Sequence, residues 1–279
     1  MGQLHGVDSL TIRLSGDVRM GLLGGRTFVM QVAHPAVGAG VNEFSAFRSD
    51  PWTRLEQIAQ SGIRYLYRGE AAGYAEGQRL RRIHASIQGI DGRGRPYHSL
   101  DPDVYGWVHT VFFDSIVTGH ALFGEPLARA QQEELFDEWR QGGRVFGLRD
   151  ADMPGSVDEY WSFYTEQIEK TLEYNPVMDW ILRGERVPRP PNLAWLPERA
   201  WSLVWRPLAR LQRQLILGTL PPAFRAKIAA QQPWTARDQR RFDRFARFVR
   251  RAVPRLPERR RYDPEAWSIL RRAQSGDVD

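Results

Sequence analysis

The sequence predicts an all-α protein, a single large helical domain. Apolar residues recur at helical spacing (i, i+3, i+4) along most of the chain. Neither a sustained period-two alternation nor a hairpin signal is evident. Three Asp-Pro pairs each place a capping carboxylate before a proline at a first helical position: Asp50-Pro51, Asp101-Pro102 and Asp263-Pro264.

The predicted helices cover nearly the whole chain. Capping-box patterns begin two of them, at Ser156–Glu159 and Thr235–Asp238. Gly69, Gly89, Gly119 and Gly142-Gly143 are expected to end helices, and Pro207 to kink or split one. The expected ranges are 18–31, 36–46, 52–68, 71–88, 102–118, 127–141, 157–174, 177–183, 196–218, 222–231, 236–252 and 264–273.

A proline-rich segment, Arg186–Asn192, reads as an extended internal joint. It separates residues 1–185, which contain every histidine, from residues 186–279, which are rich in arginine. We expect the second part to supply additional C-terminal helices that pack on the first part.

Composition excludes several classes of site. With no cysteine among 279 residues, the chain has no disulfide, no thiolate-ligated haem and no cysteine-held zinc or iron–sulfur cluster. The N-terminus lacks the pattern of a signal peptide, and the most apolar stretch, Met20–Val41, is interrupted by polar residues, proline and glycine. A cytoplasmic protein is therefore the expectation.

The formal charge is +6, and its arginines concentrate toward the C-terminus. Acidic residues are interspersed there, so a solvated basic face is the main interpretation. Peripheral contact with a membrane surface or an acidic partner is the alternative, whereas specific nucleic-acid recognition is not expected. The basic clusters are Arg240-Arg241, Arg250-Arg251 and Arg259–Arg261.

Motifs of common enzyme classes are missing from the sequence. None of the six histidines is paired with another at i+3 or i+4, and no Glu-x-x-His, His-Glu-x-x-His, Walker A or Gly-x-Ser-x-Gly motif occurs. Gly21–Gly25 lacks the spacing of a dinucleotide-binding loop. Isolated histidines in apolar surroundings remain as the best candidate chemistry.

Two such histidines lie on apolar helical faces. His109 shares a face with Tyr105, Phe112 and Ile116, and His84 shares one with Leu80 and other aliphatic residues. An imidazole in a dry, aromatic setting suits axial ligation of a haem iron. The alternative is a core histidine whose ring nitrogens are satisfied by hydrogen bonds.

Four segments in order resemble the catalytic domain shared by MpaB-type oxygenases and the latex-clearing proteins (rubber oxygenases). The resemblance spans roughly residues 15 to 235. The segments are Gln31–Val37 with Ser45–Phe47 and Asp50-Pro51; Arg81–Ile87 with Gly89; Tyr97 with Trp107–His109; and Leu220–Arg225.

The resemblance implies a globin-like helical core and a b-type haem held by one proximal histidine. Better characterised relatives use oxygen to cleave carbon–carbon double bonds in polyprenyl chains. The implied function is a haem b-dependent oxygenase acting with dioxygen on an apolar, isoprenoid-like small molecule. Two alternatives stay open: a haem-binding sensor or carrier without turnover, and a cofactor-free helical interaction protein.

The resemblance also assigns roles to residues. His109 is the expected proximal iron ligand, and His84 and Arg81 are the expected catalytic groups; His84 as the ligand is the alternative. His34 either lines the haem pocket or fixes a turn before Pro35. Arg26, Arg48 and Arg81 are candidates for pairing with the haem propionates. The other residues expected to line the haem pocket are Arg82, Phe112 and Phe113.

Overall fold

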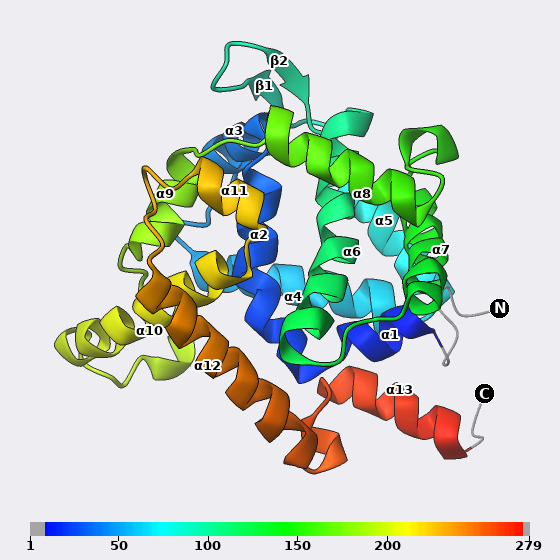
Figure 1. Ribbon diagram of the computed structural model, residues 1–279. Helices are drawn as coiled ribbons and strands as arrows, with labels where there is room; N and C mark the ends of the chain where they lie inside the picture. Colours follow the sequence, from blue (N-terminus) through cyan, green and yellow to red (C-terminus); the bar gives the residue numbers. More distant parts are fainter. Residues whose placement is uncertain (1–8, 276–279) are drawn as a thin grey trace.

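The computed structural model describes residues 9–275 and is built almost entirely of helices (Figure 1). The predicted all-α class is confirmed. Its α-helices are α1 Leu10–Ser15, α2 Gly24–Val32, α3 Pro35–Phe44, α4 Pro51–Tyr67, α5 Glu70–His84, α6 Pro102–Phe123, α7 Arg129–Val145, α8 Val157–Glu166, α9 Pro176–Arg183, α10 Glu198–Thr219, α11 Pro222–Lys227, α12 Ala236–Ala252 and α13 Pro264–Ser275.

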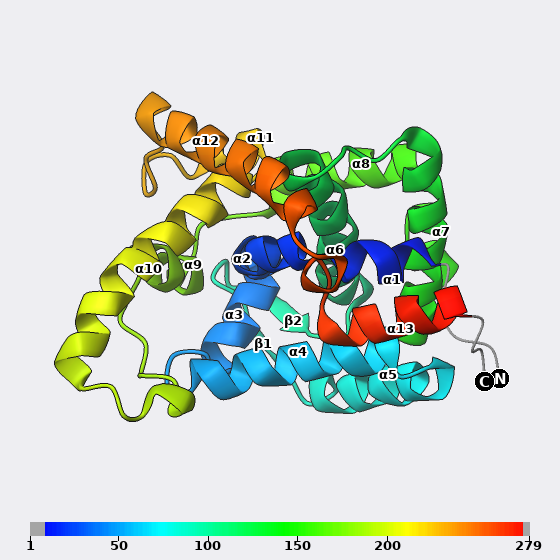
Figure 2. The same cartoon turned by 90° about the horizontal axis from the view of Figure 1, so that it is seen from below.

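The helices are arranged in layers (Figure 2). α4 and α5 lie side by side in one layer, α1, α2 and α6 occupy the middle, and α8, α11 and α12 lie on the opposite side. The central helix α6 is the most buried element, because apolar residues occur around most of its circumference. Trp107 and Val111 of α6 pack in the main core with Val29 of α2 and Leu135 of α7.

The C-terminal helices pack on the rest of the molecule. α10 packs on α2, and α12 packs on both α10 and α6. Ile216, Leu217 and Phe224 belong to the same hydrophobic core as Trp107, so residues on both sides of Arg186–Asn192 share one core. Pro207, expected to kink or split a helix, lies inside α10 and does not split it. Among residues 9–275, no helix is long and apolar enough to cross a bilayer.

A short hairpin was not anticipated from the sequence. β1 (Gln88–Ile90) pairs antiparallel with β2 (Pro96–His98), where a single long helix was expected to run to residue 88. The Asp91 carboxylate accepts hydrogen bonds from the backbone nitrogens of Arg93 and Arg95, and Gly94 has a φ of 77°. The Asp91-Gly92 pair was the local turn signal that could have predicted this hairpin.

Most of the predicted N-terminal helix caps are present in the structure. The Asp50 carboxylate caps α4, and Thr235 and Asp238 form a reciprocal capping box on α12. Asp101 differs, because its carboxylate accepts a hydrogen bond from the His98 backbone nitrogen rather than from the first turn of α6. Gly69, with a φ of 84°, follows the C-cap Arg68 of α4 as expected, whereas Gly119 lies within α6 and does not end a helix.

Gly77 allows the closest approach of α5 to α7. A Cβ at this position would lie 2.4 Å from the backbone carbonyl oxygen of Val145, and a backbone atom cannot rotate away. We therefore expect Gly77→Ala to destabilise the fold by about 1–3 kcal/mol through overpacking. Gly62→Ala on α4 is the matched control: its Cβ meets no atom within 4 Å, so it should be neutral or stabilising. Urea unfolding of both variants compares the two, and equal effects would contradict this account.

Candidate functional site

His109 lies at the middle of α6 and is fixed to α7 by a reciprocal pair of hydrogen bonds. Its Nε2 lies 2.8 Å from the carbonyl oxygen of Trp139, while Trp139 Nε1 donates to the His109 carbonyl oxygen at 3.0 Å. The two rings are stacked, with centroids 4.6 Å apart and planes 13° from parallel. The Phe146 ring approaches edge-on at 5.9 Å. The imidazole is therefore held in one orientation.

Two glycines of α7 make room for this imidazole. A Cβ at Gly143 would lie 3.2 Å from His109 Nε2 and 2.3 Å from Met153 Sδ. A Cβ at Gly142 would lie 3.5 Å from His109 Cε1 and would collide with the Tyr65 hydroxyl. Gly142-Gly143 was expected to end a helix; instead both residues lie inside α7, where close packing rather than turn formation requires them.

Burial keeps the His109 imidazole neutral. It lowers the pKa of His109 to about 4, and the hydrogen bond to the Trp139 carbonyl offsets this only in part. A carbonyl oxygen accepts only, so the proton is on Nε2 and the lone pair is on Nδ1. Within residues 9–275, Nδ1 has no protein hydrogen-bond partner, so it is the nitrogen that could bind a metal.

His84 and Arg81, at the end of α5, lie in the same neighbourhood. Arg81 Nη1 donates to the Phe146 carbonyl oxygen at 3.2 Å, and the His84 ring approaches Tyr105, one turn before His109, edge-on at 5.7 Å. His84 Nδ1 donates to the Leu80 carbonyl oxygen at 2.7 Å, which leaves the lone pair on Nε2. Burial lowers the pKa of His84 as well. The structure thus brings together the three residues to which the resemblance assigned chemistry.

Some apolar side chains of α4 and α6 remain partly uncovered. Phe112, one turn after His109, is 48% exposed, although it belongs to the predicted apolar face. No residue of α4 is buried, yet Leu55 and Ile58 share a face with Tyr65, whose ring packs on Phe146 at 4.7 Å. Tyr65, near the end of α4, thus contacts α7 and the residue that follows it, whereas Leu55 and Ile58, earlier in α4, are 59% and 44% exposed. Phe113, the neighbouring expected pocket residue, is instead fully buried among aromatic rings.

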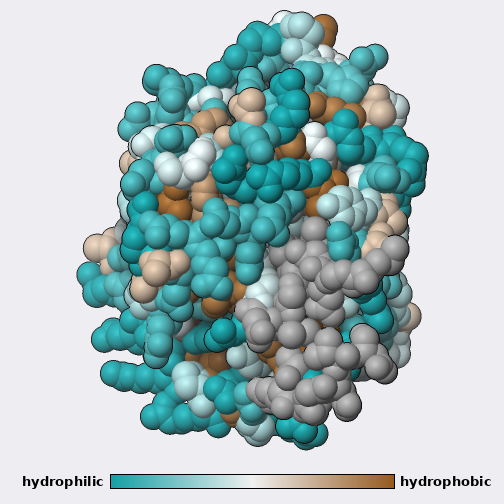
Figure 3. All heavy atoms as spheres, turned by 90° about the vertical axis from the view of Figure 1, so that its right-hand side faces the viewer, coloured by the Kyte–Doolittle hydropathy of each residue, from teal (hydrophilic) through white to brown (hydrophobic). Residues whose placement is uncertain are grey.

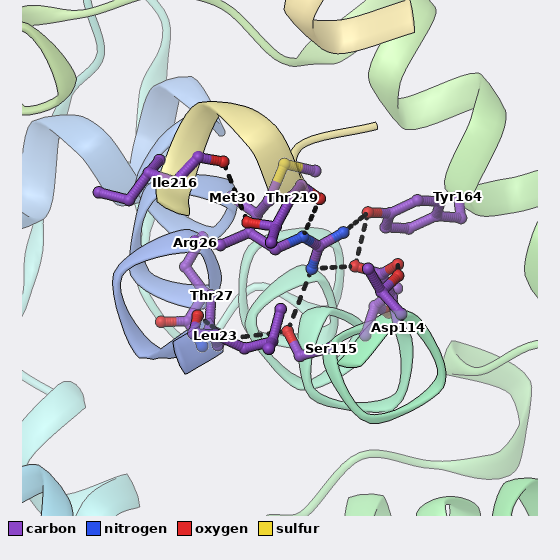
Figure 4. A network of polar contacts seen from close by, with 12 residues as sticks. Leu23, Arg26, Thr27, Met30, Asp114, Ser115, Tyr164, Ile216 and Thr219 are labelled. Atoms are coloured by element: carbon purple, nitrogen blue, oxygen red, sulfur yellow. Dashed lines mark hydrogen bonds and ion pairs between the residues drawn. The ribbon is translucent and has the colours of Figure 1, made fainter. Parts of the chain in front are cut away.

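Arg26 of α2 lies at the centre of a buried polar network that joins α2 to α6, α8 and α10 (Figure 4). Its Nη1 is 2.6 Å from Asp114 Oδ2, its Nε donates to the Thr219 carbonyl oxygen at 2.8 Å, and Tyr164 contacts both charged groups. Nη1 also donates to Ser115 at 3.2 Å. The guanidinium that was expected to pair with a propionate is thus already paired with a carboxylate of this chain.

The other expected pocket residues lie elsewhere. His34 precedes α3, and its charged neighbours are Asp91, Arg93 and Arg95 of the hairpin and Asp103 of α6. Its Nδ1 is buried without a hydrogen-bond partner among residues 9–275. Arg48 donates to Asn42 and lies over the Phe47 ring, and Arg82 is exposed. The structure does not bring these residues together with His109.

Two neutral imidazoles fit the chemistry of a haem iron. Each has one N–H donated to a backbone carbonyl, the arrangement that orients metal-ligating histidines and raises their basicity. Phe112, one turn after His109, adds a half-exposed apolar ring on α6. The described part of the chain contains no group of three or more His, Cys, Asp or Glu side chains that could hold a metal ion.

Comparison with protein families identifies the chain. Residues 12–251 match the model for the catalytic domain of the ER-bound oxygenase mpaB/B' and rubber oxygenase. The chain belongs to this oxygenase family. The resemblance inferred from four sequence segments is thereby confirmed over most of the chain, and an oxygenase-type enzyme follows at the level of the family. No curated protein and no solved structure matched the chain in the corresponding comparisons.

Sequence reasoning missed several residues of the candidate site. Trp139, Phe146 and Tyr65 surround His109 but come from α7 and α4, far from it in sequence. The adjacent glycines Gly142 and Gly143 within a helical pattern were the sequence signal that another helix approaches α7 closely. Asp114, an acid on the otherwise apolar α6, was the corresponding signal for a buried ion pair.

The buried histidines predict loss of stability in weak acid. In the folded protein the pKa values of His34 and His109 are lowered to about 4, from 6.5 for a free side chain. The unfolded chain therefore binds protons first, and stability should fall as the pH decreases from 6.5 toward 4, by up to about 1.4 kcal/mol per pH unit for each group. Urea unfolding at pH 7, 6 and 5 measures the slope. His34→Asn should make it shallower; an unchanged slope would contradict the lowered pKa of His34.

Proposed function

We propose that this oxygenase-family protein uses haem b, with His109 as the proximal ligand, to oxidise an apolar small molecule with dioxygen. The observation that carries the proposal is the convergence of His84, Arg81 and His109 through Tyr105 and Phe146. Both imidazoles are neutral, and each keeps a nitrogen lone pair available for iron. The family match over residues 12–251 supplies the oxygenase class.

When bound, haem would supply an iron centre that activates oxygen. His109 would bind through Nδ1, while Nε2–H remains donated to Trp139 and fixes the ring. His84 is neutral, so its Nε2 can accept a proton and release it again. Arg81 stays protonated and cannot act as a base; it would stabilise negative charge that develops near His84.

An apolar, isoprenoid-like substrate suits the partly exposed apolar side chains of α4 and α6. Leu55 and Ile58 of α4 and Phe112 of α6 offer dispersion contacts and lack groups that a polar substrate would need. A peripheral membrane contact through the basic C-terminal part and a cytoplasmic location are consistent proposals for an enzyme with such a substrate.

An absorption spectrum with a pyridine haemochrome assay tests the cofactor. We expect a strong Soret band and about one haem b per chain. A protein that stays colourless after reconstitution with haemin would overturn the proposal and favour a cofactor-free interaction protein. A haem protein that binds oxygen without consuming it in the presence of isoprenoids would favour a sensor or carrier. Oxygen consumption with an oxidised isoprenoid product would support the enzyme.

A further inference from the structure

α10 carries an apolar stripe that stays uncovered in the described part of the chain. Leu203 is 70% exposed, and Val204, Leu208 and Leu211 are 43–45% exposed. Spacings of four and three residues place the last three on one side of the helix. Trp195, just before α10, is 75% exposed. Single exposed apolar residues are ordinary, but a contiguous stripe marks an interaction surface.

The chain around this stripe is strongly cationic, and the nearest carboxylate in sequence, Glu198 at the start of α10, is paired with Arg186. From Arg199 to Arg237 the sequence contains six arginines and one lysine but no aspartate or glutamate. Arg199, Arg206 and Arg210 lie together on a face next to the stripe, at spacings of seven and four residues. All three are exposed, and none forms an ion pair with a carboxylate within residues 9–275.

The position of α10 leaves this surface accessible. Figures 1 and 2 show its first half on the outer flank of the molecule, away from α7 and α8. The opposite side of the molecule, drawn in Figure 3, is covered mostly by hydrophilic side chains. A separate basic cluster lies on α12 and the turn after it, where Arg244, Arg247, Arg251 and Arg255 surround Phe248, which is 66% exposed.

We propose that α10 and Trp195 form a docking surface for an anionic lipid bilayer. The leucines, Val204 and Trp195 would enter the interfacial region, while the adjacent arginines bind lipid phosphates. This combination of a tryptophan and aliphatic stripe with unpaired arginines is typical of helices that lie in a membrane interface. A second copy of the chain fits less well, because a symmetric contact would place like-charged arginines against one another.

The absence of cysteine permits a site-specific test. Leu208→Cys carrying an environment-sensitive fluorophore reports contact at α10, and Ile90→Cys on β1, where the native side chain is 69% exposed, is the matched control. With phosphatidylcholine vesicles containing phosphatidylglycerol, the label at residue 208 should shift to the blue and brighten, and the label at residue 90 should not. The response should weaken with pure phosphatidylcholine or high salt.

A charge variant supplies the second measurement. Arg206→Glu should reduce co-sedimentation with the anionic vesicles about tenfold or more, because each arginine near such a surface contributes about 1 kcal/mol. Arg13→Glu makes the same charge change on α1, away from α10, and should bind nearly as well as the wild type. Equal losses in the two variants, or equal responses of the two labels, would overturn the proposal. A label response at residue 208 that rises with protein concentration without vesicles would also overturn it, in favour of self-association. None of these outcomes depends on haem.

Discussion

Replacing Asp114 with alanine should destabilise the protein by about 3–5 kcal/mol, because it leaves the Arg26 guanidinium charged and buried without its counter-ion. Both side chains are at most 3% exposed, so water cannot replace the lost carboxylate. Tyr164 also loses the Asp114 oxygen to which its hydroxyl donates at 2.6 Å. Urea unfolding followed by circular dichroism at pH 7 measures the change.

A double variant separates charge from packing. Arg26→Met with Asp114→Leu removes both charges and keeps apolar volume, so it should be more stable than Asp114→Ala alone. If both proteins lose the same stability, the network acts through shape rather than through the buried charge. Exposed ion pairs contribute less than about 1 kcal/mol to the free energy of unfolding. A loss this small in Asp114→Ala would contradict the burial of the pair.

His109→Ala should reduce haem retention to less than about a tenth of that of the wild type, because it removes the only proposed iron–protein bond on the proximal side. His84→Ala should retain haem but lose about a hundredfold or more in turnover, the usual contribution of a positioned acid–base group. Haemochrome content and oxygen consumption measure the two effects. Complete haem loss in His84→Ala with full haem in His109→Ala would reverse the two assignments.

Two controls guard against a merely structural effect of His109→Ala. His120→Ala removes another buried histidine from α6, one whose Nε2 lies 3.3 Å from the Leu14 carbonyl oxygen, and it should retain haem. His109→Gly leaves space for free imidazole, and added imidazole should restore haem binding if the side chain is a ligand. Failure of this rescue in a variant that remains folded would indicate that His109 serves the α6–α7 contact instead.

The helical class was predictable because it depends on local sequence. The capping pairs at Asp50 and Thr235 and the apolar periodicity act within one or two turns, and the structure retains them. The family was predictable as well, since its segments keep their order along the chain. The hairpin at residues 88–98 was missed because its strands are three residues each, too short to show an alternating pattern.

The sequence by itself determined the all-α class, the oxygenase family, and which isolated histidines were candidates for chemistry. Only the tertiary structure decided what surrounds them. Periodicity states which residues share a face of a helix, but it does not state which helix covers that face. The pairing of Arg26 with Asp114, the wrapping of His109 by the glycines of α7, and the exposed stripe of α10 each depend on contacts or missing contacts between distant segments. Those contacts form only when the helices pack. An apolar face therefore looks the same in the sequence whether another helix covers it or, as on α10, it stays exposed.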